Sequence, residues 1–269
     1  MEFTKYVPVG QYLPRNSPIH TLDPRTKILA TAALMVVLFI VPSFGGLGLF
    51  AAAVVGMLML GQIPVGYALR GLRPVVIFLL LTIFLNLFFA AGDPTPVLFR
   101  LGPLVATVGG LRNGLFVGAR LILLVAITSL LTFTTSPMEM THGLEVLLRP
   151  FRRVGVPGHE LAMMMSIALR FIPTLFEETE RIAKAQMARG AAFGEGNVLR
   201  RAVAFIPVLV PLILSAFRRS EELALAMEAR CYSGGANRTR MKELRMGPAD
   251  AVAAVTVLAA SALFVLVRW

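Results

Sequence analysis

Long apolar runs separated by short polar stretches dominate the chain. Five of them approach the roughly 20 residues that a helix needs to cross about 30 Å of hydrocarbon. They are Ile28–Val41, Leu47–Leu60, Pro74–Ala91, Leu111–Phe133 and Ala249–Val267. The first two are short and bounded by glycine and proline, so one helical hairpin kinked near 42–46 fits the pattern about as well as two spans. We predict an all-α integral membrane protein with about five transmembrane helices, four of them before Thr134.

The segment that follows the fourth run opens with the signature of a short helix. Ser136 is a plausible N-cap, Pro137 suits the first helical position, and Glu139 supplies the acid of a capping box. Pro150 and Gly155 should then end this helix. The sequence therefore predicts a short amphipathic helix directly after the fourth span.

Two longer helices should complete this segment, one from about His159 to Ala188 and one roughly from Asn197 to Arg230. Each has an apolar first half and a charged second half. Met163–Met165 in the first of them suits adaptable apolar packing. The apolar half of the second, "AVAFIPVLVPLILSAF", is long enough to be a span itself, which would place the C-terminal tail inside. We prefer about three cytoplasmic helices and keep this alternative open.

The distribution of charge orients the predicted spans. The chain has 26 Lys and Arg against 15 Asp and Glu, a net charge of +11, and 16 of the basic residues lie in 134–248. The N-terminal 27 residues and the loop with Arg70 and Arg73 are basic too. Because cytoplasmic loops are enriched in Lys and Arg, all three regions should be cytoplasmic, with the Arg268–Trp269 tail outside. Such a balance is usual in bilayer proteins, so no nucleic-acid partner is expected.

Composition supports a multi-pass membrane protein, which we expect in the inner or plasma membrane of the cell. Hydrophobic residues make up 57 % of the chain, against roughly 45–50 % in soluble domains. The polar, proline-rich N-terminus is unlike a secretory signal, which begins with an apolar stretch. We expect a cytoplasmic N-terminal segment (1–27), a transmembrane region (28–133), a cytoplasmic helical region (134–248) and a last transmembrane helix (249–269).

Little in the sequence points to catalysis, a metal or a cofactor. Cys231 is the only cysteine, and His20, His142 and His159 are scattered. A P-loop motif for ATP hydrolysis is absent. A membrane-embedded lipid-modifying enzyme is the main rival function, but the cytoplasmic acids alternate with bases as on solvated helix faces. The second rival function is a self-contained transporter. It is weakened because the spans lack a chain of ionisable residues that would mark an ion path, Arg120 being an isolated exception.

A repeat links the two long helices. "AKAQMARG" (183–190) ends the first, and "ALAMEARC" (224–231) ends the second, 41 residues later. Upstream, Phe171-Ile172-Pro173 matches Phe205-Ile206-Pro207. Two helices with the same sequence pattern imply that each binds an equivalent surface of a partner.

Each terminal arginine has two interpretations. A solvated arginine at a helix C-terminus offsets the macrodipole and is worth about 0.3–1 kcal/mol. The flanking alanines instead leave space for the guanidinium to enter a groove, where it can bond to carboxylates or helix-end carbonyls of a partner. Because the arrangement occurs twice, we favour a pair of docking tips.

Three stretches in this order carry a family resemblance: "GQYLPRNSPIHTLDPRTK", "RFIPTLFEETERIAKAQMARG" and "RRSEELALAMEARCYSGG". With them the chain resembles, over nearly its whole length, the transmembrane T component of energy-coupling factor transporters, the ABC-type importers of vitamins and metal ions. The resemblance implies a scaffold without its own catalytic site. It would join two cytoplasmic ABC ATPases to a substrate-binding membrane S component and transmit ATP-driven motion between them.

The resemblance also implies roles for particular residues. The family's two Ala-Arg-Gly motifs lie at the tips of crossed cytoplasmic coupling helices and dock into the ATPases. Here they fall on Ala188-Arg189-Gly190 and Ala229-Arg230-Cys231. Cys231 replaces the glycine, so Gly234 or Gly235 is the alternative source of a left-handed turn.

Prolines should bend the coupling helices. Pro173, Pro207 and Pro211 lie within the two expected long helices, where a ring without a backbone N–H interrupts the hydrogen-bond ladder. The apolar halves of these helices should grip the S component. "DPRTK" (Asp23–Lys27) suits a polar helix start at the cytoplasmic surface, and we assign it no separate role.

Overall fold

The computed structural model describes most of the chain in two compact units. The described residues are 12–64, 66, 71–89, 96–101, 104–155, 157–191, 193, 197, 203–234, 244 and 246–266. The first unit is formed by Gln11–Gly143 and Glu243–Trp269, and the described residues of the second lie within Leu144–Lys242.

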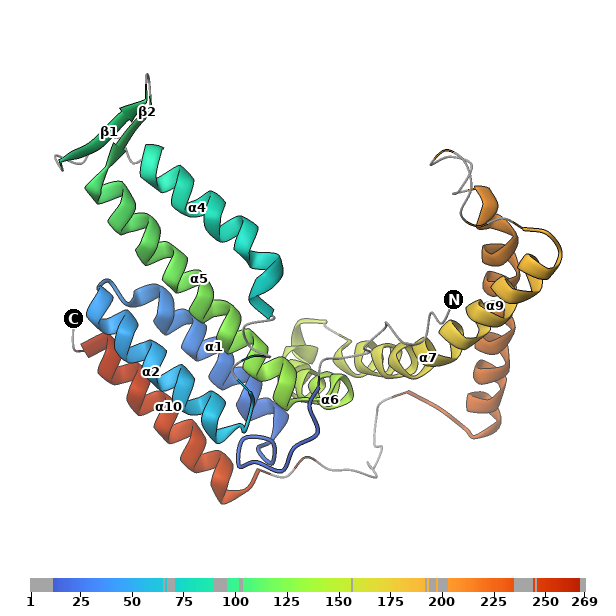
Figure 1. Ribbon diagram of the computed structural model, residues 1–269. Helices are drawn as coiled ribbons and strands as arrows, with labels where there is room; N and C mark the ends of the chain where they lie inside the picture. Colours follow the sequence, from blue (N-terminus) through green and yellow to red (C-terminus); the bar gives the residue numbers. More distant parts are fainter. Residues whose placement is uncertain are drawn as a thin grey trace. The chain divides into compact units, whose positions relative to one another are not determined.

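The first unit is built mainly from five helices (Figure 1). Its elements are α1 (Pro24–Ile40), α2 (Phe44–Leu60), the 3-10 turn η2 (Arg73–Val75), α4 (Val76–Phe89), β1 (Val97–Leu101), β2 (Leu104–Thr107), α5 (Val108–Thr134), the first half of α6 (Pro137–Leu148) and α10 (Pro248–Leu266). The predicted spans therefore correspond to α1, α2, α4, α5 and α10, with ends that shift by a few residues. Ala91, Val267, Arg268 and Trp269 lie outside the described residues.

The second unit contains the rest of α6 and two long helices. After α6 come the 3-10 segment η3 (Arg149–Val154), α7 (Gly158–Ala188) and α9 (Ile206–Ala229). The expected start of α7 at about His159 is confirmed. α9 begins later than Asn197, because Phe205 is its N-cap and Pro207 lies in its first turn. A proline that lacks an N–H suits a helix start far better than a helix interior.

Side-chain caps fix where the helices of the first unit begin. Ser43 accepts a hydrogen bond from the backbone N–H of Gly46, and Val41 before it is extended. The chain between 24 and 60 therefore forms two separate helices and not one kinked hairpin. The capping box at the start of α6 is confirmed: Ser136 N–H donates to Glu139 (3.1 Å), and Glu139 N–H donates to Ser136 (3.3 Å).

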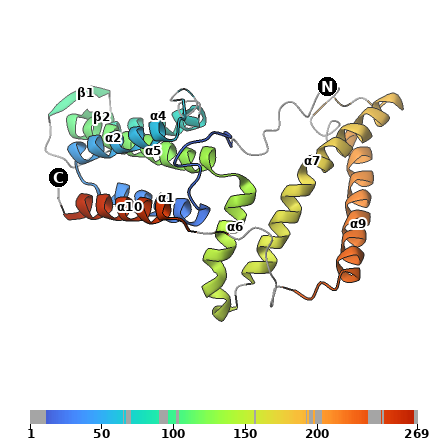
Figure 2. The same cartoon turned by 90° about the horizontal axis from the view of Figure 1, so that it is seen from below.

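A small apolar core joins α1, α2, α5 and α10. Leu38, Phe50 and Ile127 are almost fully buried in it. The rings of Phe50 and Phe264 meet edge to face, with centroids 5.4 Å apart. Because these residues come from four helices, burial of their side chains holds the first unit together (Figure 2).

Three glycines on one face of α5 allow α4 to pack very closely. A Cβ at Gly110 would lie 2.5 Å from the carbonyl oxygen of Asn86, and one at Gly114 would lie 3.2 Å from Cα of Ile83. At Gly118 the nearest atom would be 3.6 Å away. The spacing of four residues is the small-xxx-small pattern of membrane helix pairs.

Arg120 lies in the middle of α5 and faces other residues of the same unit. Its Nη2 donates to the carbonyl oxygen of Val41, the C-cap residue of α1, at 2.7 Å. Its guanidinium also lies over the ring of Phe116, 4.8 Å from the centroid. An arginine within an apolar helix thus satisfies a helix-end carbonyl, which supports its reading as an interior residue and not as part of an ion path.

The outer faces of the first unit are strongly apolar. Ile77 and Phe78 of α4 and Val252 and Val255 of α10 are each about two-thirds or more exposed. Within the described residues, α5 is the helix with both the length and the apolar composition to cross a bilayer, and α2, α4 and α10 contain shorter apolar helices. Side chains of this kind suit contact with lipid and are unfavourable in water.

An antiparallel hairpin of β1 and β2 connects α4 to α5 (Figure 1). The sequence pattern predicts only helices and loops, so this small sheet is an addition to the predicted fold. It leaves the fold class all-α, as predicted.

Candidate functional site

The end of α7 has the geometry of a Schellman motif. Arg189 is the C-cap, and Gly190 after it has a left-handed φ of 90°. Gly190 N–H donates to Met187 O, and Ala191 N–H donates to Gln186 O, both at 3.0 Å. These two bonds satisfy carbonyls that a helix end otherwise leaves open.

The end of α9 repeats the two hydrogen bonds of this motif. Arg230 is the C-cap, and Cys231 has a left-handed φ of 55°. Cys231 N–H donates to Glu228 O at 2.9 Å, and Tyr232 N–H donates to Met227 O at 3.0 Å. The repeat of 41 residues in the sequence is thus a repeat of local structure.

Cys231 itself supplies the left-handed residue for which Gly234 or Gly235 was the proposed alternative. Gly234 also has a positive φ, of 88°, but it lies three residues further on. Gly235 is outside the described residues. The two bonds of the motif hold Cys231 in a conformation that ordinarily costs an L-residue about 1–2 kcal/mol.

All six residues of the two motifs are exposed, namely Ala188, Arg189, Gly190, Ala229, Arg230 and Cys231. The alanine before each arginine and the small residue after it add little bulk beside the guanidinium. Each arginine also lies at the negative end of a helix macrodipole. The arrangement can present a planar, five-donor cation to a partner surface.

The tips lie at opposite ends of a crossed, antiparallel helix pair (Figures 1 and 2). Near the middle, Arg219 of α9 forms an ion pair with Glu178 of α7 at 3.1 Å, and Ser215 also bonds to Glu178. Near the end of α7, Gln186 donates to the carbonyl of Pro207 at 3.3 Å. α9 has 24 residues, so its tip lies about 36 Å along the helix from this contact.

An open apolar groove of about 320 Å³ runs between the two helices. α7 contributes Ile167, Phe171 and Leu175, and α9 contributes Leu223, Ala224 and Met227 among others. The groove lies on the side of the Glu178 crossing that holds the start of α7 and the end of α9. It therefore lies between this crossing and the tip of α9.

Large apolar side chains also cover the outside of this pair. Phe217 and Leu225 of α9 are 69 % and 60 % exposed, and Met164 and Met165 of α7 are about half exposed. Met163 is only partly exposed. Phe217 and the methionines lie in the apolar halves expected from the sequence, whereas Leu225 lies in the charged half of α9.

The three prolines have different positions in the two helices. Pro173 is inside α7, and Pro211 is inside α9. Pro207 lies in the first turn of α9, so it begins this helix and is not in its interior. The Phe-Ile-Pro repeat is accordingly not a structural repeat, because Phe171-Ile172-Pro173 lies within α7.

Candidate chemistry of other kinds is limited. Among the described residues, no group of three or more His, Cys, Asp or Glu side chains could hold a metal ion. His159 pairs with Glu145 at 2.9 Å, which joins α6 to α7. Within this part of the chain, the repeated helix ends are the most specific feature for function.

A buried polar cluster around "DPRTK" is not evident from the sequence pattern. Its helix-start role is confirmed, since Asp23 is the N-cap of α1 and Pro24 follows it. The local pattern gave no sign, however, that Asp23 is bonded to Asp250, 227 positions away. The position of Lys27 at the edge of an apolar run is the one sequence feature that could have indicated a buried lysine, which then needs hydrogen-bond partners.

Comparison with known proteins defines the class. A family model described as CbiQ, cobalt transport protein, matches residues 15–241. Because the match covers most of the chain, the chain belongs to this family of membrane transport proteins.

Individual relatives are more specific. The energy-coupling factor transporter transmembrane protein EcfT of Thermosediminibacter oceani is 58 % identical over 247 residues, 92 % of each chain. Proteins of the same name from Acidaminococcus fermentans and Bacillus subtilis are 50 % and 43 % identical over 263 residues, 97–98 % of each chain. The family resemblance inferred from the three motifs is confirmed: this chain is an energy-coupling factor transporter transmembrane component of the EcfT and CbiQ type.

Proposed function

We propose that this chain is the scaffold of an importer for a vitamin or metal ion and that it links two cytoplasmic ABC ATPases to one substrate-binding S component. The observation that carries the proposal is the pair of equivalent helix ends. Each presents an exposed arginine, Arg189 or Arg230, on the same Schellman motif. Two helix ends with the same pair of Schellman hydrogen bonds, at opposite ends of one helix pair, suit two copies, or two homologues, of one partner.

In this proposal the chain itself has no catalytic site. The ATPases would bind and hydrolyse ATP, and their opening and closing would displace the tips. The Glu178–Arg219 ion pair and the bond from Gln186 to Pro207 connect α7 to α9, so displacement of one tip would act on both helices. Pro173 and Pro211 are the positions where bending would occur.

The S component would contact the apolar surfaces of the coupling helices. Phe217 and the Met164–Met165 pair, which lie in the apolar halves of these helices, offer exposed apolar area. Methionine side chains adapt to different partner shapes, which suits a scaffold that serves more than one S component.

We further propose that the chain crosses the cell membrane several times with its N-terminus in the cytoplasm. Hydrogen bonds bring the start of α1, the end of α5 and the start of α10 together at one end of the first unit. This arrangement supports an even number of crossings from α1 to α5, as the positive-inside rule predicts.

Isolation of the complex from membranes tests the proposal. We expect the wild-type chain to co-purify with two ATPases and one small membrane protein, and ATP-driven uptake to collapse in the Arg189→Ala/Arg230→Ala variant. Normal assembly and uptake by that variant would show that the tips are not the docking elements.

A further inference from the structure

A buried polar cluster within the first unit joins the end of α5 and the segment before α10, which flank the coupling region in sequence. The chain leaves the first unit after Gly143 and re-enters it at Glu243. α5 ends at Thr134, shortly before the first passage, and α10 begins at Pro248, shortly after the second. The side chains of Lys27 and Arg25 donate to backbone carbonyls at the end of α5 and before α10.

Lys27 binds the end of α5, from which the chain continues into the coupling region. Its side chain is buried, with only 6 % of the residue exposed. Its Nζ donates to the carbonyl oxygen of Thr134, the last residue of α5, and to that of His20, both at 2.9 Å. A helix-end carbonyl lacks a partner within its own helix, so the ammonium satisfies it and fixes the end of α5 to α1.

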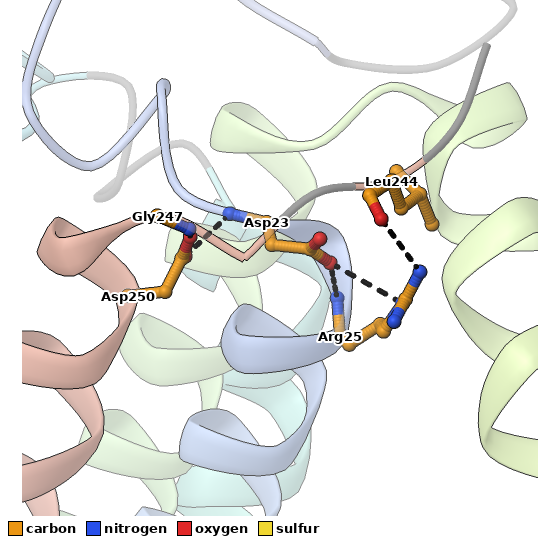
Figure 3. A network of polar contacts seen from close by, with 5 residues as sticks. All are labelled: Asp23, Arg25, Leu244, Gly247 and Asp250. Atoms are coloured by element: carbon orange, nitrogen blue, oxygen red, sulfur yellow. Dashed lines mark hydrogen bonds and ion pairs between the residues drawn. The ribbon is translucent and has the colours of Figure 1, made fainter.

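Arg25 binds the segment through which the chain leaves the coupling region and reaches α10. Its Nη2 donates to the carbonyl oxygen of Leu244 at 3.2 Å. The carboxylate of Asp23 keeps this guanidinium in place, with Asp23 Oδ1 3.7 Å from Arg25 Nε and 2.9 Å from the backbone nitrogen of Arg25 (Figure 3). Leu244 precedes α10 by only a few residues.

Asp250 completes the cluster from the other side. Its Oδ1 accepts from the backbone N–H of Asp23 at 2.7 Å, and its Oδ2 accepts from Gly247 at 2.8 Å (Figure 3). One carboxylate therefore joins the first turn of α10 to the residue that caps α1. Asp23 and Asp250 are both buried, which shields these bonds from water.

We infer that Asp23, Arg25, Lys27 and Asp250 are positioning residues that anchor both ends of the coupling region to the membrane helices, so that motion of the tips reaches those helices. The inference rests on the proposed function. A helix pair passes on a displacement only where its connections to the next rigid element are fixed. With one end released, the connecting segment would absorb the displacement and ATP would be hydrolysed without transport.

The test uses the purified wild-type complex in liposomes, with radioactive Co²⁺ or radiolabelled riboflavin as the probe, whichever the complex accumulates. The quantity measured is the amount of probe taken up per ATP hydrolysed. Loss of folded complex lowers uptake and hydrolysis together and leaves this ratio unchanged, so the ratio separates coupling from stability.

For Arg25→Ala we expect normal assembly and ATP hydrolysis. The amount of probe taken up per ATP hydrolysed should fall about tenfold, because one buried hydrogen bond from a charged group is lost. Arg25→Lys keeps a donor for Leu244 and should restore much of the ratio. Asp250→Asn, which keeps its shape, should lower the ratio as well. Thr256→Val on α10 is the matched control, because Thr256 donates only to Val252 O of its own helix, and its ratio should equal that of the wild type.

An unchanged ratio in assembled Arg25→Ala and Asp250→Asn complexes would overturn the inference. Failure of both variants to assemble would overturn it too, since the cluster would then serve folding and not coupling. Failure of the wild-type chain to bind ATPases would instead contradict the proposed function.

Discussion

Cys231 occupies the same place at the end of α9 as Gly190 does at the end of α7. Both have a positive φ, and the N–H of each donates to the carbonyl three residues before it. Nothing lies within 4 Å of a Cβ built on Gly190. The left-handed backbone, and not crowding, is therefore what favours glycine there.

Replacing the left-handed residue at each tip should have opposite effects on the stability of the two helix ends. Gly190→Ala should weaken the last turn of α7 by about 1 kcal/mol, and Cys231→Gly should strengthen that of α9 by up to about 1 kcal/mol. Hydrogen exchange of the amides of Ala191 and Tyr232, which close the two motifs, measures these changes. Gly56→Ala in α2 is the control, since its surroundings are open and its φ is not positive. Changes of the same sign at both tips would refute the equivalence.

The glycine face of α5 predicts a graded series of stabilities. An added Cβ would meet its nearest atom at 2.5 Å at Gly110, 3.2 Å at Gly114 and 3.6 Å at Gly118. Gly110→Ala should therefore cost about 1–3 kcal/mol by overpacking. Gly118→Ala should be neutral or slightly stabilising, because alanine favours a helix by about 0.5–1 kcal/mol. Thermal unfolding in detergent should rank the three variants in this order, and equal losses at all three sites would be inconsistent with the close α4–α5 contact.

His20 should make the first unit less stable in mild acid. Burial is the main cause that lowers the pKa of His20 below its ordinary 6.5, and the positive charge of Lys27 adds to it. Between the lowered pKa and 6.5 the unfolded chain binds more protons than the folded one, so stability falls as the pH decreases through this window.

Thermal unfolding at about pH 7.5 and about pH 5.5 measures this dependence. His20→Gln keeps a donor for the carbonyl of Leu13, to which His20 Nε2 is bonded at 3.0 Å, but does not titrate. The variant should lose less stability than the wild type over this interval. An identical loss in both proteins would mean that other groups cause the effect.

Much of the fold could be predicted because its signals are local. The apolar runs placed α1, α2, α4, α5 and α10, and the Ser136–Glu139 capping box placed the start of α6. The end of α7 followed from Gly190, which the left-handed turn favours. These features depend on neighbours within a few residues.

The remaining features depend on opposing local preferences of the backbone or on partners that are distant in the sequence. Pro207 lies in an apolar run that looks like a continuous helix, yet its missing N–H favours a new helix start. Cys231 adopts a left-handed φ because two backbone hydrogen bonds outweigh the cost of its Cβ. The bond between Asp23 and Asp250 joins residues from the two ends of the chain, and no local pattern reports it.

The affinity of the purified ATPases for this chain tests the central claim most directly. Truncating an arginine that anchors an interface typically costs about 2 kcal/mol, or about thirtyfold in affinity. Arg189→Ala and Arg230→Ala should each weaken one of two ATPase sites by this factor, and the double variant should weaken both. Arg181→Ala, an exposed arginine of α7 away from the tip, should bind as the wild type does. Two ATPases bound to the double variant with wild-type affinity would contradict the account.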